Sequence, residues 1–372
     1  MDLAFTEDER ALADEAREWL AANYVAPAPF ATFDDEIAWG RGWQRQLADA
    51  RWVGIAWPEE YGGRAATPLQ VALVNVEYAR SRAPQPVNRV GLNLAAPTLL
   101  AYGTEEQKQR FLPPLLRASE IWCQLFSEPD AGSDLASLRT KATRVDGGWR
   151  LSGQKVWTSY AQHATWGICL ARTDAEAPKH KGISYLVVDI KAPGVTIRPL
   201  VQITGEAEFN EVFLDDVFVA DDCVIGTVDD GWRVANTTLA HERGTTFPLK
   251  EQIVHEVYFA RLLEQTMERL DDLVIGDELA EAYVELRLLA LSNLRMLSRL
   301  SRGEEPGPES SVVKLQWSTL TQHLSDLALR LEPDDPGWAR QFLWSKAASI
   351  AGGTSEVQKT IIGERILGLP RG

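Results

Sequence analysis

The segment QLFSEPDAGSD, residues 124–134, marks the point at which the hydrophobic pattern of the chain changes. Upstream of it the apolar residues recur with a helical period, and downstream they form short extended runs. Within the segment, small residues and hydroxyl side chains leave backbone N–H groups open toward a ligand. We therefore expect a binding site where a helical domain meets a β domain.

The part before this segment is predicted to be helical. Thr6 and Glu9 have the spacing of a capping box, which should begin an amphipathic helix that runs through Leu20. Thr104 opens a second capping signal, and the two prolines at 113–114 are expected to end the helix that follows.

The part after the segment is predicted to contain short antiparallel strands, because Gly, Asp or Pro clusters separate its apolar runs. These runs are residues 149–155, 167–171, 183–190, 195–201 and 210–219. From Gly231 the helical period returns. One long helix is indicated by apolar residues at steps of four and three, namely Leu279, Tyr283, Leu286, Ala290, Leu294 and Leu297. The predicted domains are residues 1–120 (helical), 121–225 (β) and 226–372 (helical).

Composition narrows the classes of function. The chain of 372 residues has 38 Lys plus Arg against 53 Asp plus Glu, a net charge of −15, which argues against binding to nucleic acid or to an anionic membrane. The first ten residues show neither a signal peptide nor an anchor, and no apolar run approaches the roughly 18 residues of a membrane span. Three widely spaced cysteines fit no disulfide framework, so a cytoplasmic location is expected.

Common cofactor motifs are missing from the sequence. It contains no Gly-x-Gly-x-x-Gly and no Walker loop, and its five histidines lack metal-binding spacing, so a catalytic metal is not expected. A second informative segment is GQKVWTS, residues 153–159, which places a large aromatic ring beside hydroxyl donors. Such a pair suits a flat heteroaromatic ring such as a flavin, which needs one covered face and hydrogen bonds along its edge.

On six segments the chain resembles the acyl-CoA dehydrogenase family over nearly its full length. They are WPEEYGG (57–63), YGTEEQK (102–108), SEP with GSD (127–134), KVWTS (155–159), FNEVF (209–213) and GTSEVQ (353–358). The resemblance implies an α+β fold with an N-terminal helical domain, a middle β-barrel or sandwich domain and a C-terminal four-helix bundle. It also implies FAD as cofactor, an acyl-CoA substrate and an electron-transfer flavoprotein as electron acceptor.

The resemblance also assigns roles to residues. It implies that Gln124, Ser127 and Ser133 line the flavin and thioester side of a cleft, and Ser133 would also contact substrate. Trp157 and Ser159 would contact the flavin ring, whereas Thr354 and Glu356 would lie along the pyrophosphate and adenosine side of FAD. Structural alternatives are a helix cap or turn for Ser133 and Asp134, and a core aromatic at a domain seam for Trp157.

The base that removes the α-proton is predicted at Glu242. Many members carry this carboxylate immediately before the Gly-Thr of the last motif, where this chain has Gly352. Other members place it early in the C-terminal domain, and this chain has LAHERG at residues 239–244. Gly352 would then donate its backbone N–H to the thioester oxygen, and Arg243 would meet the CoA chain. The alternative for Glu242 is a solvated helix-surface carboxylate beside an arginine, as in the pair Glu364 and Arg365.

Two family features in the C-terminal domain are absent. An Arg-x-x-Phe-Gly segment and a Gly-Gly-rich turn usually reach the FAD of a neighbouring subunit, whereas this chain has MERLDD (267–272) and LEPDDPG (331–337). The resemblance is therefore to a bacterial subgroup with the base on the early C-terminal helix, similar to steroid side-chain acyl-CoA dehydrogenases, some of which are heterotetramers. A homotetramer is the other arrangement expected.

The leading hypothesis is an FAD-dependent acyl-CoA dehydrogenase that forms a trans-2-enoyl-CoA from a branched, long or ring-bearing acyl group. Two alternatives share the fold, an acyl-CoA oxidase and a flavin monooxygenase that would not need Glu242. The third alternative is a non-catalytic, FAD-poor partner subunit of a heteromeric acyl-CoA dehydrogenase, which the absent C-terminal features favour.

Overall fold

The computed structural model describes residues 6–244, 247–300, 302–304 and 307–370; within these ranges the side chains of 242–244, 247–250 and 300 are not described. The chain divides into two compact units. One comprises Pro27–Ala65 and Pro84–Glu242, and the other comprises Met1–Ala26, Ala66–Ala83 and Arg243–Gly372. Each unit has a hydrophobic core of its own.

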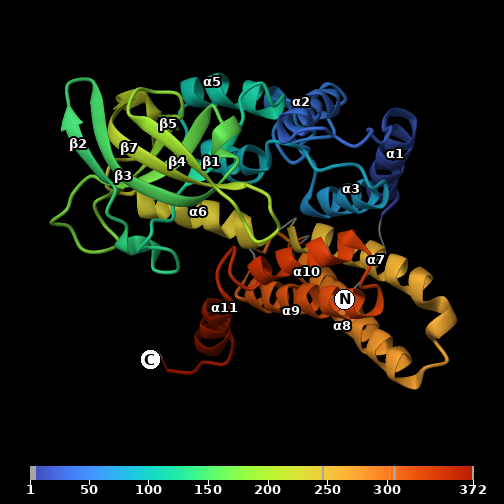
Figure 1. The fold of residues 1–372 in the computed structure, drawn as a ribbon. Coiled ribbons are helices and arrows are strands. Elements are labelled where there is room, and N and C mark those ends of the chain that lie inside the picture. Colours follow the sequence, from blue (N-terminus) through green and yellow to red (C-terminus); the bar gives the residue numbers. More distant parts are fainter. Residues whose placement is uncertain (1–5, 245–246, 301, 305–306, 371–372) are drawn as a thin grey trace. The chain divides into compact units, whose positions relative to one another are not determined.

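The first unit is built on one sheet of eight strands (Figure 1). Its strands are β1 (Trp122–Leu125), β2 (Lys141–Val145), β3 (Gly148–Ser159), β4 (Trp166–Arg172), β5 (Ile183–Asp189), β6 (Val195–Leu200), β7 (Phe209–Ala220) and β8 (Val224–Ile225). The strand order is β6-β7-β3-β2-β4-β5-β8, and β1 pairs with β4. The helices of this unit are α2 (Phe33–Asp49), α4 (Ala96–Tyr102), α5 (Glu105–Leu116) and α6 (Gly231–Gly244).

The sheet is mixed rather than wholly antiparallel. β1 pairs with β4 in parallel, and so does β2 through Lys141 and Arg172, whereas the other neighbours are antiparallel. A parallel pair needs a long crossover connection, and the segment that contains β2 and β3 supplies it between β1 and β4. The five predicted runs correspond to β3, β4, β5, β6 and β7.

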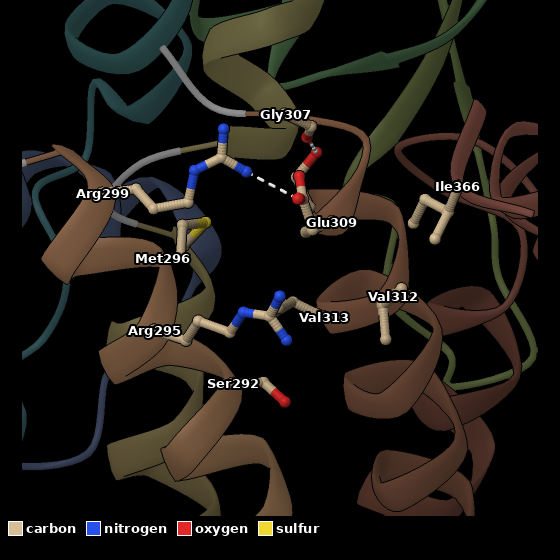
Figure 2. Close-up of a pocket in the computed structure, with 10 residues that line it drawn as sticks. Ser292, Arg295, Met296, Arg299, Gly307, Glu309, Val312, Val313 and Ile366 are labelled. Atoms are coloured by element: carbon tan, nitrogen blue, oxygen red, sulfur yellow. Dashed lines mark hydrogen bonds and ion pairs between the residues drawn. The ribbon is translucent and has the colours of Figure 1, made fainter. Parts of the chain in front are cut away.

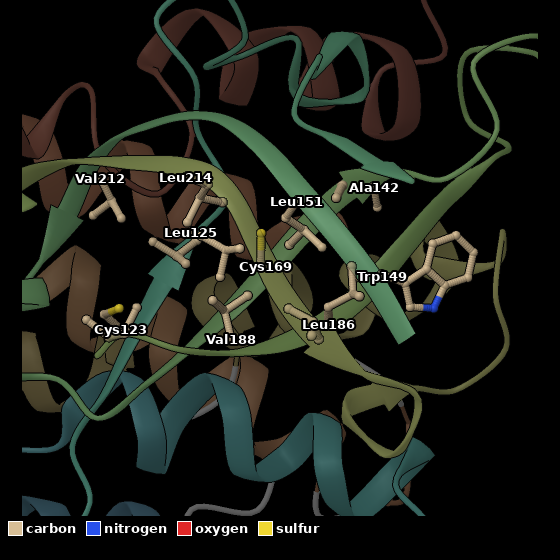
Figure 3. Packing of buried hydrophobic residues seen from close by; sticks show 14 of the residues in the cluster. Cys123, Leu125, Ala142, Trp149, Leu151, Cys169, Leu186, Val188, Val212 and Leu214 are labelled. Atoms are coloured by element: carbon tan, nitrogen blue, oxygen red, sulfur yellow. The ribbon is translucent and has the colours of Figure 1, made fainter. Parts of the chain in front are cut away.

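Buried apolar side chains from several strands form the core beneath this sheet (Figure 3). Cys123 and Leu125 of β1, Cys169 of β4 and Leu186 of β5 are fully buried in this cluster. Burial raises the pKa of Cys169 to about 11. Cys123 and Cys169 are therefore inert core residues, in agreement with their free thiols.

The second unit is helical. It consists of α1 (Glu7–Asn23), α3 (Pro68–Arg80), α7 (Phe247–Thr266), α8 (Leu273–Leu300), α9 (Glu309–Leu331), α10 (Pro336–Ala348) and α11 (Ser355–Ile361). Apolar residues of α7, α8, α9 and α10 share one core, which includes Leu262, Leu286, Leu320, Leu327 and Trp338. Among the described helices, none is both long and apolar enough to cross a bilayer.

Both predicted helix N-caps are confirmed. Thr6 and Thr104 form the predicted capping boxes with Glu9 and Gln107. The predicted stop at the two prolines was wrong, because α5 continues to Leu116. Proline removes an N–H donor but keeps a helical φ, so the helix continues for two residues after Pro114.

Most of the predicted apolar face of α8 is confirmed. Leu279, Leu286, Ala290 and Leu297 are buried as expected, whereas Leu294 is half-buried and Tyr283 is 50% exposed. Ala282 and Leu289 are buried as well, so the buried face extends to the side of the helix away from Tyr283. Tyr283 is therefore at the edge of the apolar face.

Candidate active site

The two segments that the sequence singles out are adjacent in the sheet unit. Gln124 lies in β1, and Ser127 follows just after that strand. The second segment is the end of β3, where the N–H of Val156 donates to the carbonyl oxygen of Ser127 at 2.9 Å. Gln124, Ser127 and Ser159 are all half-buried. The fold thus joins the Ser127 segment to the end of β3 that contains Trp157 and Ser159.

Trp157 has an unusual backbone and an exposed side chain. Its φ is +60°, which non-glycine residues rarely adopt. The cause is a bulge, because Lys155 pairs with Val212 and Thr158 with Asn210, so β3 has an extra residue there. The indole ring is 61% exposed and meets Phe209 edge-on, with ring centroids 6.0 Å apart. Trp157 is therefore not buried in the core of its own unit.

The residue after Ser159 is fixed from two sides. Tyr160 has a φ of +57°, and its N–H donates to the carbonyl oxygen of Glu208 at 2.9 Å. The guanidinium of Arg89 donates to the Tyr160 hydroxyl at 2.9 Å and lies 3.7 Å from the Glu208 carboxylate. Burial raises the pKa of Tyr160. These contacts hold the end of β3, and no local sequence pattern predicts them.

Asp134, the residue after Ser133, stabilises the loop that contains both. The carboxylate of Asp134 accepts a hydrogen bond from Ser137 at 2.7 Å and pairs with Lys179 at 2.6 Å. Asp134 is therefore a turn residue, in agreement with its structural alternative. Ser133 itself is exposed, and its predicted contact with cofactor and substrate stays a prediction.

These residues fit a flavin by their chemistry. An exposed aromatic ring offers a face for a flat heterocycle, and the hydroxyls of Ser127 and Ser159 with the Gln124 amide offer polar contacts at its edge. The Thr158 hydroxyl is fully buried and has no hydrogen-bond partner among the described residues. Together these groups form a suitable donor set for FAD.

The second predicted group lies in the helical unit, at the turn before α11. Gly352 and Gly353 have φ values of +66° and +95°. The buried Gln358 side chain donates to the carbonyl oxygens of Gly352 at 3.4 Å and Gly353 at 3.2 Å. Within the described residues, the N–H of Gly352 makes no hydrogen bond. A left-handed backbone is thus one reason for glycine at position 352.

Thr354 and Glu356 make hydrogen bonds at the start of α11. The Thr354 hydroxyl caps this helix by accepting from the N–H of Val357 at 3.2 Å. Hydrogen bonds from its own backbone N–H and from Thr354 lower the pKa of the exposed Glu356 carboxyl. Their predicted place along the FAD pyrophosphate and adenosine remains a prediction.

The predicted base lies in the last turn of α6. Glu242 is helical, but its side chain and that of Arg243 lie outside the described part of the structure. Thr238, one turn earlier, is fully buried and bonds to the hydroxyls of Thr98 at 2.7 Å and Tyr185 at 3.2 Å. This hydroxyl cluster fixes the helix just before Glu242.

The two segments that depart from the family pattern contact each other in the helical unit. Arg269 donates to the carbonyl oxygen of Leu331 at 2.7 Å and lies 3.7 Å from the Glu332 carboxylate. Asp335 caps α10 and pairs with Arg261. Both segments therefore stabilise their own unit.

A separate cavity of about 200 Å³ lies between α8 and α9 (Figure 2). Arg295 and Arg299 line it from α8, and Arg299 pairs with Glu309 at 2.6 Å. No residue that the sequence predicted for the site lines this cavity.

Comparison with known proteins identifies the family. The profiles described as acyl-CoA dehydrogenase N-terminal, middle and C-terminal domains match residues 6–119, 123–217 and 229–367. The chain belongs to the acyl-CoA dehydrogenase family, and its fold is the three-domain fold of that family: helices, a β-sheet domain, then helices.

Among relatives, acyl-CoA dehydrogenase FadE34 of Mycobacterium tuberculosis is 46% identical over 340 residues, which are 88% of this chain and 46% of FadE34. This chain therefore spans less than half the length of FadE34. Acyl-CoA dehydrogenase IpdE1 of the same organism is 43% identical over 342 residues, 89% of this chain and 88% of IpdE1.

Solved structures of acyl-CoA dehydrogenases have the same fold. The steroid ACAD Tcur3481-Tcur3483 has a TM-score of 0.86 at 26% identity, and the match covers 100% of both chains. The ChsE4-ChsE5 complex from Mycobacterium tuberculosis has a TM-score of 0.83 at 27% identity, also over 100% of both chains.

Proposed function

We propose that this chain is an FAD-dependent acyl-CoA dehydrogenase that forms a trans-2-enoyl-CoA. The observation that carries the proposal is the exposed, left-handed Trp157 beside the half-buried Ser127 and Ser159, in a member of this family. When bound, FAD supplies the acceptor for the hydride that leaves the β-carbon. Gln124, Ser127, Trp157 and Ser159 would hold its flavin ring.

The proposed base is Glu242, whose carboxylate would take the α-proton of the acyl group. The N–H of Gly352 would donate to the thioester oxygen, which lowers the cost of the developing enolate charge. Its lack of a partner among the described residues supports this role. Arg243 would contact the CoA chain.

The proposed substrate is a branched, long or ring-bearing acyl-CoA. Gly352 supports it, since the family's common carboxylate is missing there and leaves space. The steroid ACAD with the same fold supports a steroid side-chain thioester in particular.

The proposed electron acceptor is an electron-transfer flavoprotein, and the proposed assembly is a homotetramer or a heterotetramer with a homologous subunit. Two related structures carry two component names, Tcur3481-Tcur3483 and ChsE4-ChsE5, which supports the heteromeric form. The segments around Arg269 and Asp335 also support the heteromeric form, because their described contacts are to residues of their own unit.

The test is turnover of the Glu242→Gln variant with a panel of linear, branched and steroid side-chain acyl-CoA thioesters. Loss of the base should reduce turnover about 100-fold to 10,000-fold while FAD and acyl-CoA still bind. Glu364→Gln is the matched control, since Glu364 also precedes an arginine, and it should keep wild-type turnover. Wild-type turnover in Glu242→Gln would refute the assignment of the base.

A further inference from the structure

A buried lysine joins the two segments proposed to face the flavin. Lys155 of β3 is 0% exposed. Its ammonium donates to the carbonyl oxygen of Phe126 at 3.1 Å, to the carboxylate of Glu128 at 2.9 Å and to the carbonyl oxygen of Leu170 at 2.8 Å. An ammonium has three N–H donors, so each of them has a fixed partner.

The Glu128 carboxylate, the charged partner of Lys155, is also held by several hydrogen bonds. Its carboxylate accepts the N–H of Arg139 at 2.6 Å and the N–H of Thr140 at 2.8 Å, besides the Lys155 ammonium. The side chain is only 8% exposed. The pair thus connects the 126–128 segment, β3, β4 and the start of β2.

The Glu128–Lys155 pair lies next to the residues proposed to contact the flavin. Phe126 and Glu128 flank Ser127, while Lys155 precedes the bulge that exposes Trp157. Between these contacts, the N–H of Val156 donates to the carbonyl oxygen of Ser127. A shift of Lys155 would therefore move Ser127 and Trp157 relative to each other.

We propose that the Glu128–Lys155 ion pair is a positioning element that fixes the Ser127 segment and the Trp157 bulge in the geometry that FAD requires. This inference rests on the proposed function. A buried ion pair often gives no more stability than apolar side chains of similar volume, because both charges lose their hydration. What it adds here is direction, since charged hydrogen bonds tie two backbone carbonyls to Lys155 and two backbone amides to Glu128 in one geometry.

The test compares Lys155→Met and Glu128→Gln with a control that destabilises the same sheet away from the site, Val219→Ala. Val219 is buried in the same sheet but pairs with Trp149, at the opposite end of β3 from Trp157. FAD affinity, the visible absorption spectrum of bound flavin and its midpoint potential are measured on the full chain, together with the melting temperature.

Both pair variants should weaken FAD binding by about tenfold or more, the effect of one lost charged contact, and should change the flavin spectrum or potential. Val219→Ala should bind FAD as the wild type does. Equal FAD affinity in the pair variants and the control would overturn the inference, and so would failure of both pair variants to fold. A wild-type chain that binds no FAD either alone or together with a homologous subunit would overturn the proposed function as well.

Discussion

At the scale of single residues, the site depends on backbone conformations that few side chains tolerate. Trp157 at φ +60° and Gly352 at φ +66° lie in the left-handed region that a non-glycine residue enters at a modest cost. Gly353 at φ +95° lies further from the ideal left-handed value of about +57°. The two glycines of the turn should therefore differ in their tolerance of a side chain.

We expect Gly353→Ala to destabilise the protein more than Gly352→Ala. Alanine at 352 should cost about 1–2 kcal/mol, the usual cost of the left-handed conformation. At 353 the added Cβ would also lie 2.6 Å from the Gln358 amide nitrogen. Urea unfolding of both variants measures the difference, and equal losses would contradict it.

The Glu128 carboxyl should make stability depend on pH. Burial raises its pKa, but the Lys155 charge and the hydrogen bonds to Thr140, Lys155 and Arg139 outweigh burial, so the pKa lies below the ordinary 4.5. A lowered pKa gives stability that is complete above about 4.5 and is lost as the pH falls through the folded-state value.

Glu128→Gln should therefore cost about 3–5 kcal/mol at neutral pH, because it leaves the Lys155 charge buried without its partner. The difference between wild type and variant should shrink as the pH falls through the folded-state pKa, since a protonated Glu128 resembles Gln. Unfolding midpoints at several pH values measure it. A difference that stays constant down to low pH would contradict this explanation.

Among site residues, the sequence predicted the aromatic and hydroxyl set but not its support. The KVWTS segment predicted Trp157 and Ser159 as site residues, and the SEP segment predicted Ser127. The partnership of Glu128 with Lys155 joins residues far apart in the sequence, and the contact of Arg89 with Tyr160 spans more still. Neither leaves a local pattern, so only tertiary structure reveals it.

At the scale of elements, long or regular runs were predicted and short or unusual ones were not. β3, β4, β5 and β7 have extended apolar patterns, whereas β1 and β8 are too short to show a period. Parallel pairing of β1 with β4 depends on the path of the chain between them, which periodicity does not encode.

The start of β1 depends on one buried side chain, Asn88. Its amide donates to the carbonyl oxygens of Leu115 at 2.9 Å and Glu120 at 3.0 Å, and its oxygen accepts the N–H of Trp122 at 2.9 Å. The end of α5 and the beginning of β1 are thus joined through Asn88.

Asn88→Ala should destabilise the protein by at least about 2 kcal/mol, because buried backbone groups lose their partners. Denaturant unfolding measures the loss. The exposed Asn23, whose amide bonds only to the carbonyl oxygen of Trp19 among described residues, is the control, and Asn23→Ala should change stability by less. Equal effects would show that the Asn88 contacts do not stabilise this junction.

At the scale of the whole molecule, the order of helices, β domain and helices followed from the change of hydrophobic period, and the family profiles agree with it. The proposed cofactor should couple to folding. A ligand that binds only the native state stabilises it by about 2.7 kcal/mol at a concentration 100 times its dissociation constant.

The melting temperature should therefore rise with FAD concentration. ADP-ribose, which lacks the flavin ring, should raise it less, because the ring is the part that Trp157 and Ser159 are proposed to contact. Scanning calorimetry at increasing FAD and ADP-ribose measures both. Equal shifts for the two compounds would contradict the assignment of the flavin site.

The proposed reaction of this chain, with FAD bound, removes two hydrogens from an acyl-CoA. The most direct measurement loads the purified chain with FAD, removes free flavin, determines bound FAD per chain and native mass, and then adds acyl-CoA thioesters without oxygen. We expect close to one FAD per chain and a product two hydrogens lighter by mass spectrometry, with loss of the oxidised flavin absorbance. A chain that holds FAD but leaves every thioester of the linear, branched and steroid side-chain panel unchanged in mass, alone and with a homologous subunit, would contradict it.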